Sequence, residues 1–156
     1  MTTTVKFDEL PSLVGQVLGQ SDWVTVTQDM IDSFGRTTGD EQWIHMDVER
    51  AKAESPFGTA IAHGYLTLSL IPMLHTQALR IDGVAMGVNY GSNKVRFPSP
   101  VPSGARVNGT FKLLEAEPIA GGGFQLVTEV TVAVEGADKP SCVAETVSRV
   151  YPAPSA

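Results

Sequence analysis

The spacing of apolar residues divides the chain into a first half with helical periodicity and a second half with strand periodicity. Residues 28–38 carry one apolar stripe, which predicts a helix that ends at Gly39. A short strand is expected just before it, at residues 23–26, where Thr25 resembles the first position of a helix capping box. A second, shorter helix is expected at residues 48–53, capped by the preceding aspartate.

Residues 64–80 have a different pattern, because their apolar side chains cover almost the whole circumference of a helix. Such a helix is buried on most sides. Pro72 removes one hydrogen bond and is expected to bend the helix, which a helix wrapped by a sheet can tolerate. The sequence therefore predicts one long, buried central helix.

The second half of the chain alternates apolar and polar residues between turns rich in proline and glycine. This pattern predicts strands at residues 84–90, 94–97, 106–115, 124–135 and 141–151. One buried helix followed by a long antiparallel sheet is typical of an α+β fold in which the sheet curls around the helix. With 156 residues and no linker, the whole chain, residues 1–156, is expected to form a single domain.

The composition of the chain indicates which kinds of binding partner and which cellular compartment to expect. Apolar residues make up 42% of the chain, and the net charge of −6 argues against nucleic acid as a partner, because such proteins cluster Lys and Arg. The single cysteine, Cys142, cannot form an internal disulfide and indicates a reducing compartment. Residues 61–79 are too polar for a membrane span, and the first residues show no secretory signal. We therefore expect a cytoplasmic protein that does not insert into membranes.

The segment with the strongest chemical signal contains Asp40 and His45, in a turn between two short helices. A carboxylate and an imidazole at this spacing can converge on one small volume and share a bound water. Such a pair can both remove and return a proton near neutral pH. The alternative is that Asp40 only caps a turn and that His45 is a structural histidine, and the spacing alone does not decide between the two.

Two further features could bind a ligand. His63 and Gly64 stand at the start of the central helix, where the free N–H of Gly64 could bind an oxygen that gains negative charge. Gly64 could equally serve tight packing alone, and His63 could be a structural hydrogen bonder. Lys94 and Arg96 alternate with apolar residues on a strand and could meet phosphates, although solvated charges are the ordinary explanation. The sequence contains no zinc spacing, phosphate loop, dinucleotide fingerprint or nucleophile elbow.

Taken together, these residues resemble the MaoC-like dehydratases, the (R)-specific enoyl-CoA hydratases, and in particular their NodN-like branch. The matching positions of the family signature are Phe34, Thr38, Gly39, Asp40, Ile44, His45 and Ala51. Gln42 and Trp43 depart from it, since the family usually has Asn and Pro there. A serine that supports the catalytic pair in some members falls near Pro72 here, which puts that contact in doubt.

The resemblance implies a hot-dog fold, in which an antiparallel sheet wraps a central helix, and a homodimer with an acyl tunnel beside the helix. It implies that Asp40 and His45 are catalytic, that Gly64 donates its N–H to the thioester carbonyl, and that no metal or other cofactor takes part, because coenzyme A belongs to the substrate. The implied reaction is hydration of trans-2-enoyl-CoA to (R)-3-hydroxyacyl-CoA, or its reverse, in fatty acid metabolism. The alternatives are an acyl-CoA thioesterase, disfavoured because residues 65–77 lack Asp and Glu, and a non-catalytic acyl-binding subunit of a dehydratase complex.

Overall fold

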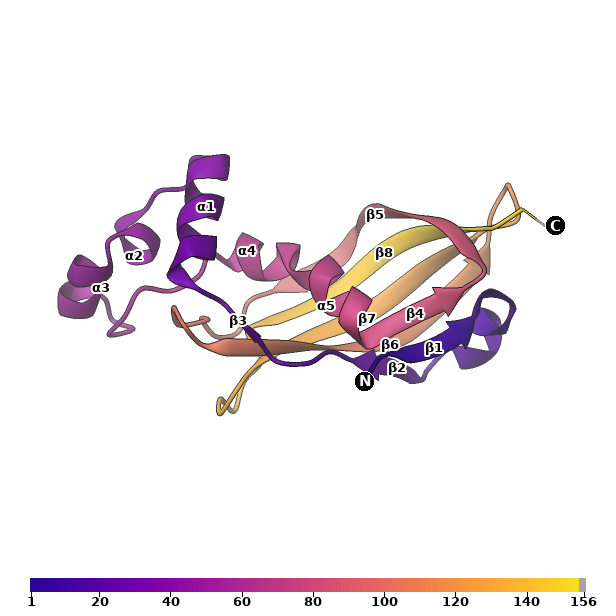
Figure 1. The fold of residues 1–156 in the computed structure, drawn as a ribbon, viewed down its shortest axis with the longest axis horizontal. Helices are drawn as coiled ribbons and strands as arrows, with labels where there is room; N and C mark the ends of the chain where they lie inside the picture. Colours follow the sequence, from indigo (N-terminus) through magenta and orange to yellow (C-terminus); the bar gives the residue numbers. More distant parts are fainter. Residues whose placement is uncertain (155–156) are drawn as a thin grey trace.

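A six-stranded antiparallel sheet forms one layer of the molecule in the computed structural model, which describes residues 1–154 (Figure 1). Five strands pair in the order β2-β6-β7-β8-β5, and β3 also pairs with β6. Their bounds are β2 (Val17–Gln20), β3 (Val24–Thr25), β5 (Val84–Arg96), β6 (Arg106–Pro118), β7 (Phe124–Val134) and β8 (Cys142–Pro152). A separate parallel pair, β1 (Thr3–Lys6) and β4 (Leu79–Asp82), lies next to the 3-10 helix η1 (Phe7–Leu13).

The helices occupy two positions relative to this sheet. Helices α4 (Gly64–Ser69) and α5 (Ile71–Ala78) lie across one face of the sheet, whereas the remaining helices gather beyond one of its ends (Figure 1). These are α1 (Gln28–Thr38), α2 (Trp43–Met46) and α3 (Val48–Glu54). None of the helices in residues 1–154 has the length and apolar content that a membrane span needs.

The core lies between α4–α5 and the inner face of the sheet. Successive side chains of a strand point to opposite faces, and β7 and β8 direct Val130 and Ala144, among others, into this core. Leu74 of α5 and Phe111 of β6 belong to this core and are almost completely buried. The predicted α+β class, with a long antiparallel sheet packed around buried helices, is confirmed.

The prediction of one long central helix over residues 64–80 is wrong. The helix is divided at Leu70 into α4 and α5, and Pro72 stands in the first turn of α5, where its missing N–H leaves no hydrogen bond unmade. At Leu79 the backbone becomes extended and continues as β4, because this segment pairs with β1 in parallel register. Pairing with a strand from the N-terminus is a long-range contact that helical periodicity does not report.

Several element boundaries also differ from the predictions. The strands expected at residues 84–90 and 94–97 are one continuous strand, β5, whose register against β8 shifts at bulges. The cap of α1 is Thr27 rather than Thr25, since the Thr27 hydroxyl accepts a hydrogen bond from the Met30 N–H at 3.2 Å. Gly39 ends α1 as predicted, with a φ of 80°.

Candidate active site

The loop that carries Asp40 and His45 is held against α1 by close contacts. After Gly39, the chain turns back through Asp40, and α2 presents His45. Gly35 permits this approach, because a side chain there would place its Cβ 2.6 Å from the Met46 sulfur. The Gln28 amide, at the start of α1, donates a hydrogen bond to the His45 carbonyl at 2.7 Å. The sequence predicts that both residues lie in a turn, but only Asp40 does, because His45 lies within the short helix α2. Packing on α1 holds this segment in place.

The His45 ring is buried and has a defined tautomer. Its Nδ1 lies 2.7 Å from the Ile61 carbonyl oxygen. A carbonyl can only accept, so Nδ1 carries the proton and donates it to Ile61. In the neutral ring the lone pair is then on Nε2. His45 is thus oriented as a proton acceptor at Nε2.

His63 lies directly against His45, with the two rings stacked at 3.9 Å between centroids and 28° between planes. Its Nε2 lies 2.8 Å from the backbone oxygen of Asp40, to which it donates a hydrogen bond by the same reasoning. Its Nδ1 is buried and has no hydrogen-bond partner within residues 1–154. His63 therefore positions the backbone of Asp40 and the ring of His45 together.

The pKa of His45 is lowered from its ordinary value, mainly because burial disfavours the charged imidazolium. The hydrogen bond to Ile61 opposes this shift, the neighbouring His63 lowers the pKa further, and the Asp40 carboxylate raises it. The pKa of a base that works near neutral pH needs to lie below that pH. His45 is consequently neutral at pH 7 and able to accept a proton.

Asp40, His45 and His63 form one cluster, in which one polar side-chain atom from each lies within 4.8 Å of the others. Asp40 is exposed, while the two histidines are buried, so the cluster opens to solvent on the carboxylate side. Two histidines and a carboxylate are residue types that could hold a metal ion or a shared water. The expectation that no metal takes part stays a prediction.

Gly64 begins α4 directly after His63, and its side-chain position is filled by a neighbour. A Cβ on Gly64 would lie 2.9 Å from the Phe97 ring, which immediately follows the end of β5. Arg96 is thereby brought near the start of α4, and Lys94 lies on the same exposed strand. Neither cation contacts the cluster of Asp40 and the histidines through a hydrogen bond or an ion pair within the described part of the chain.

Two contacts of this site could not be found from the sequence. The Ile61 carbonyl that fixes the His45 tautomer belongs to the backbone, and any residue type would supply it. The Gln28 amide reaches His45 across 17 positions of sequence. The sequence pattern predicts that a helix begins at Gln28, but it does not indicate that the Gln28 side chain contacts the site.

Comparison with known proteins identifies the family. Residues 9–136 match the family model described as a MaoC-like domain. The chain is 50% identical over 149 residues to 3-hydroxyacyl-thioester dehydratase Z of Mycobacterium tuberculosis, covering 96% of this chain and 98% of that protein. It is 48% identical to nodulation protein N of Rhizobium leguminosarum, covering 87% and 85% of the two chains. Its fold is similar to that of a MaoC-like dehydratase from Rhodospirillum rubrum, with a TM-score of 0.74 and 20% identity over 91% of this chain and 94% of that one.

Proposed function

Because the chain belongs to the MaoC-like dehydratase family and is an enzyme of the hydratase and dehydratase type, we propose that it hydrates trans-2-enoyl-CoA to (R)-3-hydroxyacyl-CoA and catalyses the reverse dehydration. The single observation that carries this proposal is the cluster that brings Asp40 to His45, a buried histidine whose Nδ1 donates to Ile61 and whose Nε2 is unprotonated. A relative that is half identical is named for a 3-hydroxyacyl thioester, which supports a thioester substrate here.

In the proposed mechanism, one water is held between the Asp40 carboxylate and Nε2 of His45. As the water oxygen bonds to C3 of the enoyl group, Nε2 accepts one of its protons and the C2–C3 double-bond electrons move toward the thioester carbonyl. The imidazolium, stabilised by Asp40, then returns a proton to C2 on the same face, so that one water is added in total. General acid–base help of this kind contributes roughly 10²- to 10⁴-fold.

The charge that develops on the thioester oxygen needs a donor. We assign this role to the Gly64 N–H, one of the first N–H groups of α4, with His63 beside it. One such donor is worth roughly 10²- to 10³-fold in rate. Lys94 and Arg96 lie at the end of β5, directly before the Phe97 ring that packs on Gly64, and we propose that they meet the coenzyme phosphates. Charge reversal at both should raise KM for the thioester more than it lowers kcat.

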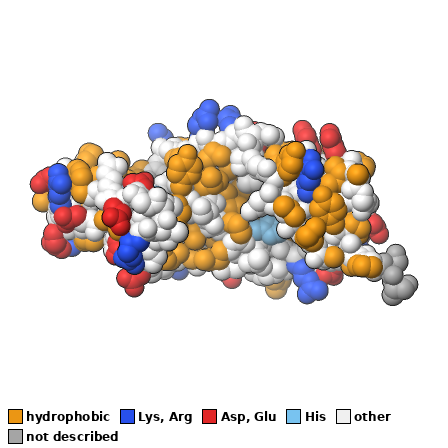
Figure 2. Space-filling model, turned by 90° about the horizontal axis from the view of Figure 1, so that it is seen from above, with side chains coloured by type: hydrophobic (Ala, Val, Ile, Leu, Met, Phe, Trp, Pro, Cys, Tyr) orange, Lys and Arg blue, Asp and Glu red, His pale blue; other side chains and the backbone are white. Residues whose placement is uncertain are grey.

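The proposed assembly is a homodimer in the cytoplasm. In residues 1–154, no strand pairs with the outer edge of β5, although this strand has 13 residues and is almost entirely exposed. Its exposed side chains include Met86, Val88 and Tyr90. Viewed from the β5 side, hydrophobic side chains gather along the middle of the molecule (Figure 2). A long, free and apolar strand edge favours pairing with a second copy. A monomer mass by light scattering at working concentration would contradict the homodimer.

The decisive experiment incubates the purified protein with trans-2-enoyl-CoA and follows three readouts: loss of the double bond, release of free thiol, and the chirality of the product. Hydration to the (R) product supports the proposal. Thiol release would identify a thioesterase instead, although α4 and α5 carry no Asp or Glu, and no reaction would favour a non-catalytic acyl-binding subunit. The Asp40→Asn protein is the control for catalysis by contaminants.

A further inference from the structure

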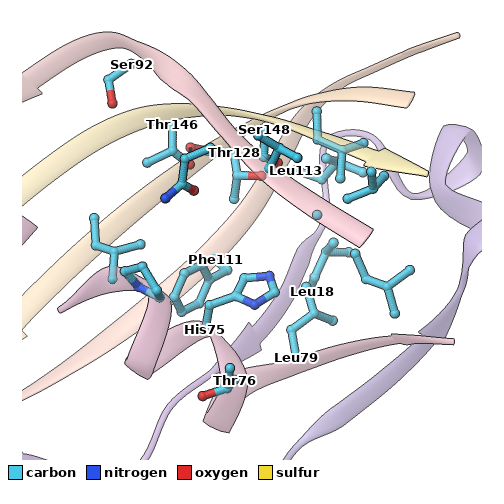
Figure 3. A pocket seen from close by; sticks show the side chains of 18 of the residues that line it. Leu18, His75, Thr76, Leu79, Ser92, Phe111, Leu113, Thr128, Thr146 and Ser148 are labelled. Atoms are coloured by element: carbon cyan, nitrogen blue, oxygen red, sulfur yellow. Dashed lines mark hydrogen bonds between the residues drawn. The ribbon is translucent and has the colours of Figure 1, made fainter. Parts of the chain in front are cut away.

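A cavity of about 620 Å³ lies between α5 and the inner face of the sheet. Figure 3 shows hydroxyl-bearing side chains of the strands on one side of it and α5 on the other. The helix wall combines the apolar side chains of Ile71 and Pro72 with those of His75 and Thr76, and His75 packs edge-on against Phe111 of the sheet. Leu68 and Ser69, at the end of α4, also line the cavity. Since Gly64 is only four residues before Leu68, roughly 6 Å along the helix, α4 leads from the active site into this cavity.

The sheet wall of the cavity carries a polar belt, which we define as Asn89, Ser92, Thr128, Thr146 and Ser148. Strand register explains how five residues from three strands come together. Asn89 pairs with Ser148, while Ser92 pairs with Thr146, which in turn pairs with Thr128. The belt therefore consists of one row that crosses β5, β8 and β7 and an adjacent row on β5 and β8, which meets Leu126 on β7.

The belt interrupts a face that is otherwise apolar. The row on one side of it pairs Val150 with Phe124, and the row on the other side pairs Ala144 with Val130. All four side chains belong to the hydrophobic core or pack against it. A hydroxyl on such a face costs free energy unless it has a hydrogen-bond partner.

Not all hydroxyl groups of the belt form hydrogen bonds within residues 1–154. The Thr146 hydroxyl donates to the Thr128 carbonyl at 3.3 Å. Within residues 1–154, no hydrogen bond involves the side-chain hydroxyls of Thr128 or Ser148, and both side chains are half-buried. The hydroxyl groups of Thr128 and Ser148 can therefore still donate and accept hydrogen bonds, and both residues line the cavity.

The cavity wall is also without formal charge. Of the residues that line it within the described chain, none is Asp, Glu, Lys or Arg. His75 lies opposite the belt, and burial lowers its pKa, so it is neutral at pH 7. A charged group, such as a second carboxylate on the acyl chain, would be desolvated here without a counter-ion.

We propose that this cavity takes an acyl chain that carries an uncharged oxygen, a hydroxyl or a carbonyl, in its distal part, and that the polar belt binds this oxygen. The inference rests on the proposed function, because it assumes that the acyl group of a coenzyme A thioester enters the cavity beside α4. It narrows the substrate class from simple fatty enoyl thioesters to oxygenated ones.

The test compares dissociation constants of saturated thioesters, which cannot be hydrated, by isothermal titration calorimetry. The probes are decanoyl-CoA and a series of monohydroxydecanoyl-CoA thioesters, each with its hydroxyl on a different carbon of the distal half. At least one hydroxylated probe should bind about tenfold more tightly than decanoyl-CoA, the effect of one good hydrogen bond. Thr128→Val and Ser148→Ala, tested separately, should each reduce that ratio at least about threefold, without weakening decanoyl-CoA.

Thr131→Val is the matched control, because it removes a threonine hydroxyl from the same strand but from the opposite face of the sheet. It should leave the ratio unchanged. Equal or tighter binding of decanoyl-CoA than of every hydroxylated probe would overturn the inference, as would a preference that survives both belt variants. Preferential binding without any hydration of the trans-2-enoyl-CoA that carries the preferred distal hydroxyl would instead refute the proposed function while leaving the belt intact. Failure of all probes to bind would refute both.

Discussion

Replacing Asp40 by Asn is the sharpest test of the catalytic pair, because the structure separates the chemical role of this residue from its structural one. Within residues 1–154, no hydrogen bond or ion pair reaches the Asp40 carboxylate, and the position is held through its backbone oxygen by His63. Asn keeps both that backbone contact and the side-chain volume. The free energy of unfolding should therefore change by no more than about 0.5 kcal/mol.

The loss of activity can be estimated from the geometry. A carboxylate within 4.8 Å of the His45 ring stabilises the imidazolium by about 1 to 3 kcal/mol, between the limits of water and a protein surface. Each 1.36 kcal/mol is tenfold in rate, so this charge alone accounts for roughly 5- to 160-fold. Loss of a water ligand adds to this, and we expect kcat to fall by at least about 10²-fold.

The assay measures kcat and the melting temperature of four proteins: the unchanged chain, Asp40→Asn, His45→Gln and the double variant. His45→Gln should also lose about 1 to 3 kcal/mol of stability, because the Ile61 carbonyl loses a buried donor. If both residues act on one water, the double variant should lose much less activity than the product of the two single losses. Full kcat in Asp40→Asn would refute the reasoning, and so would a loss that is matched by a melting temperature lowered by several degrees.

Three other predictions concern the pH dependence of the reaction, the packing of Gly64 and the reactivity of Cys142. The kcat/KM should fall as the pH drops through the lowered pKa of His45, below the ordinary value of about 6.5, because the base must be neutral. The midpoint of this pH profile should be lower still in Asp40→Asn, since Asp40 raises the pKa of His45. A midpoint above pH 7 in the unchanged protein would contradict this prediction. Gly64→Ala should lower kcat/KM by about tenfold to a hundredfold, because its Cβ would meet the Phe97 ring. In a chain that already carries Phe97→Ala, adding Gly64→Ala should cost much less, since the ring is gone. Cys142 should resist alkylation at pH 7 until the protein unfolds, because burial raises the pKa of its thiol to about 11; rapid labelling of the folded protein, followed by mass spectrometry, would show the reverse.

Local sequence signals determined the elements that depend on local interactions. The apolar stripe of α1 and the left-handed Gly39 that ends it were predictable, because a helix and its cap involve residues only a few positions apart. The alternation in β7 predicted a strand with two unlike faces for the same reason. The spacing of Asp40 and His45 in a turn likewise indicated that the two side chains would converge, and the structure brings them together.

Tertiary structure decided the features that depend on distant partners. Leu79 is extended rather than helical because it pairs with β1, which lies near the N-terminus. The His45 tautomer was set by a carbonyl 16 positions away, and carbonyl groups are the same in every residue. The polar belt exists only through the register of β5, β8 and β7, since its members are scattered polar residues until three strands align them. Periodicity predicts which face of an element is buried. The residues that this face contacts depend on strand register and on backbone contacts, and these are fixed only in the folded chain.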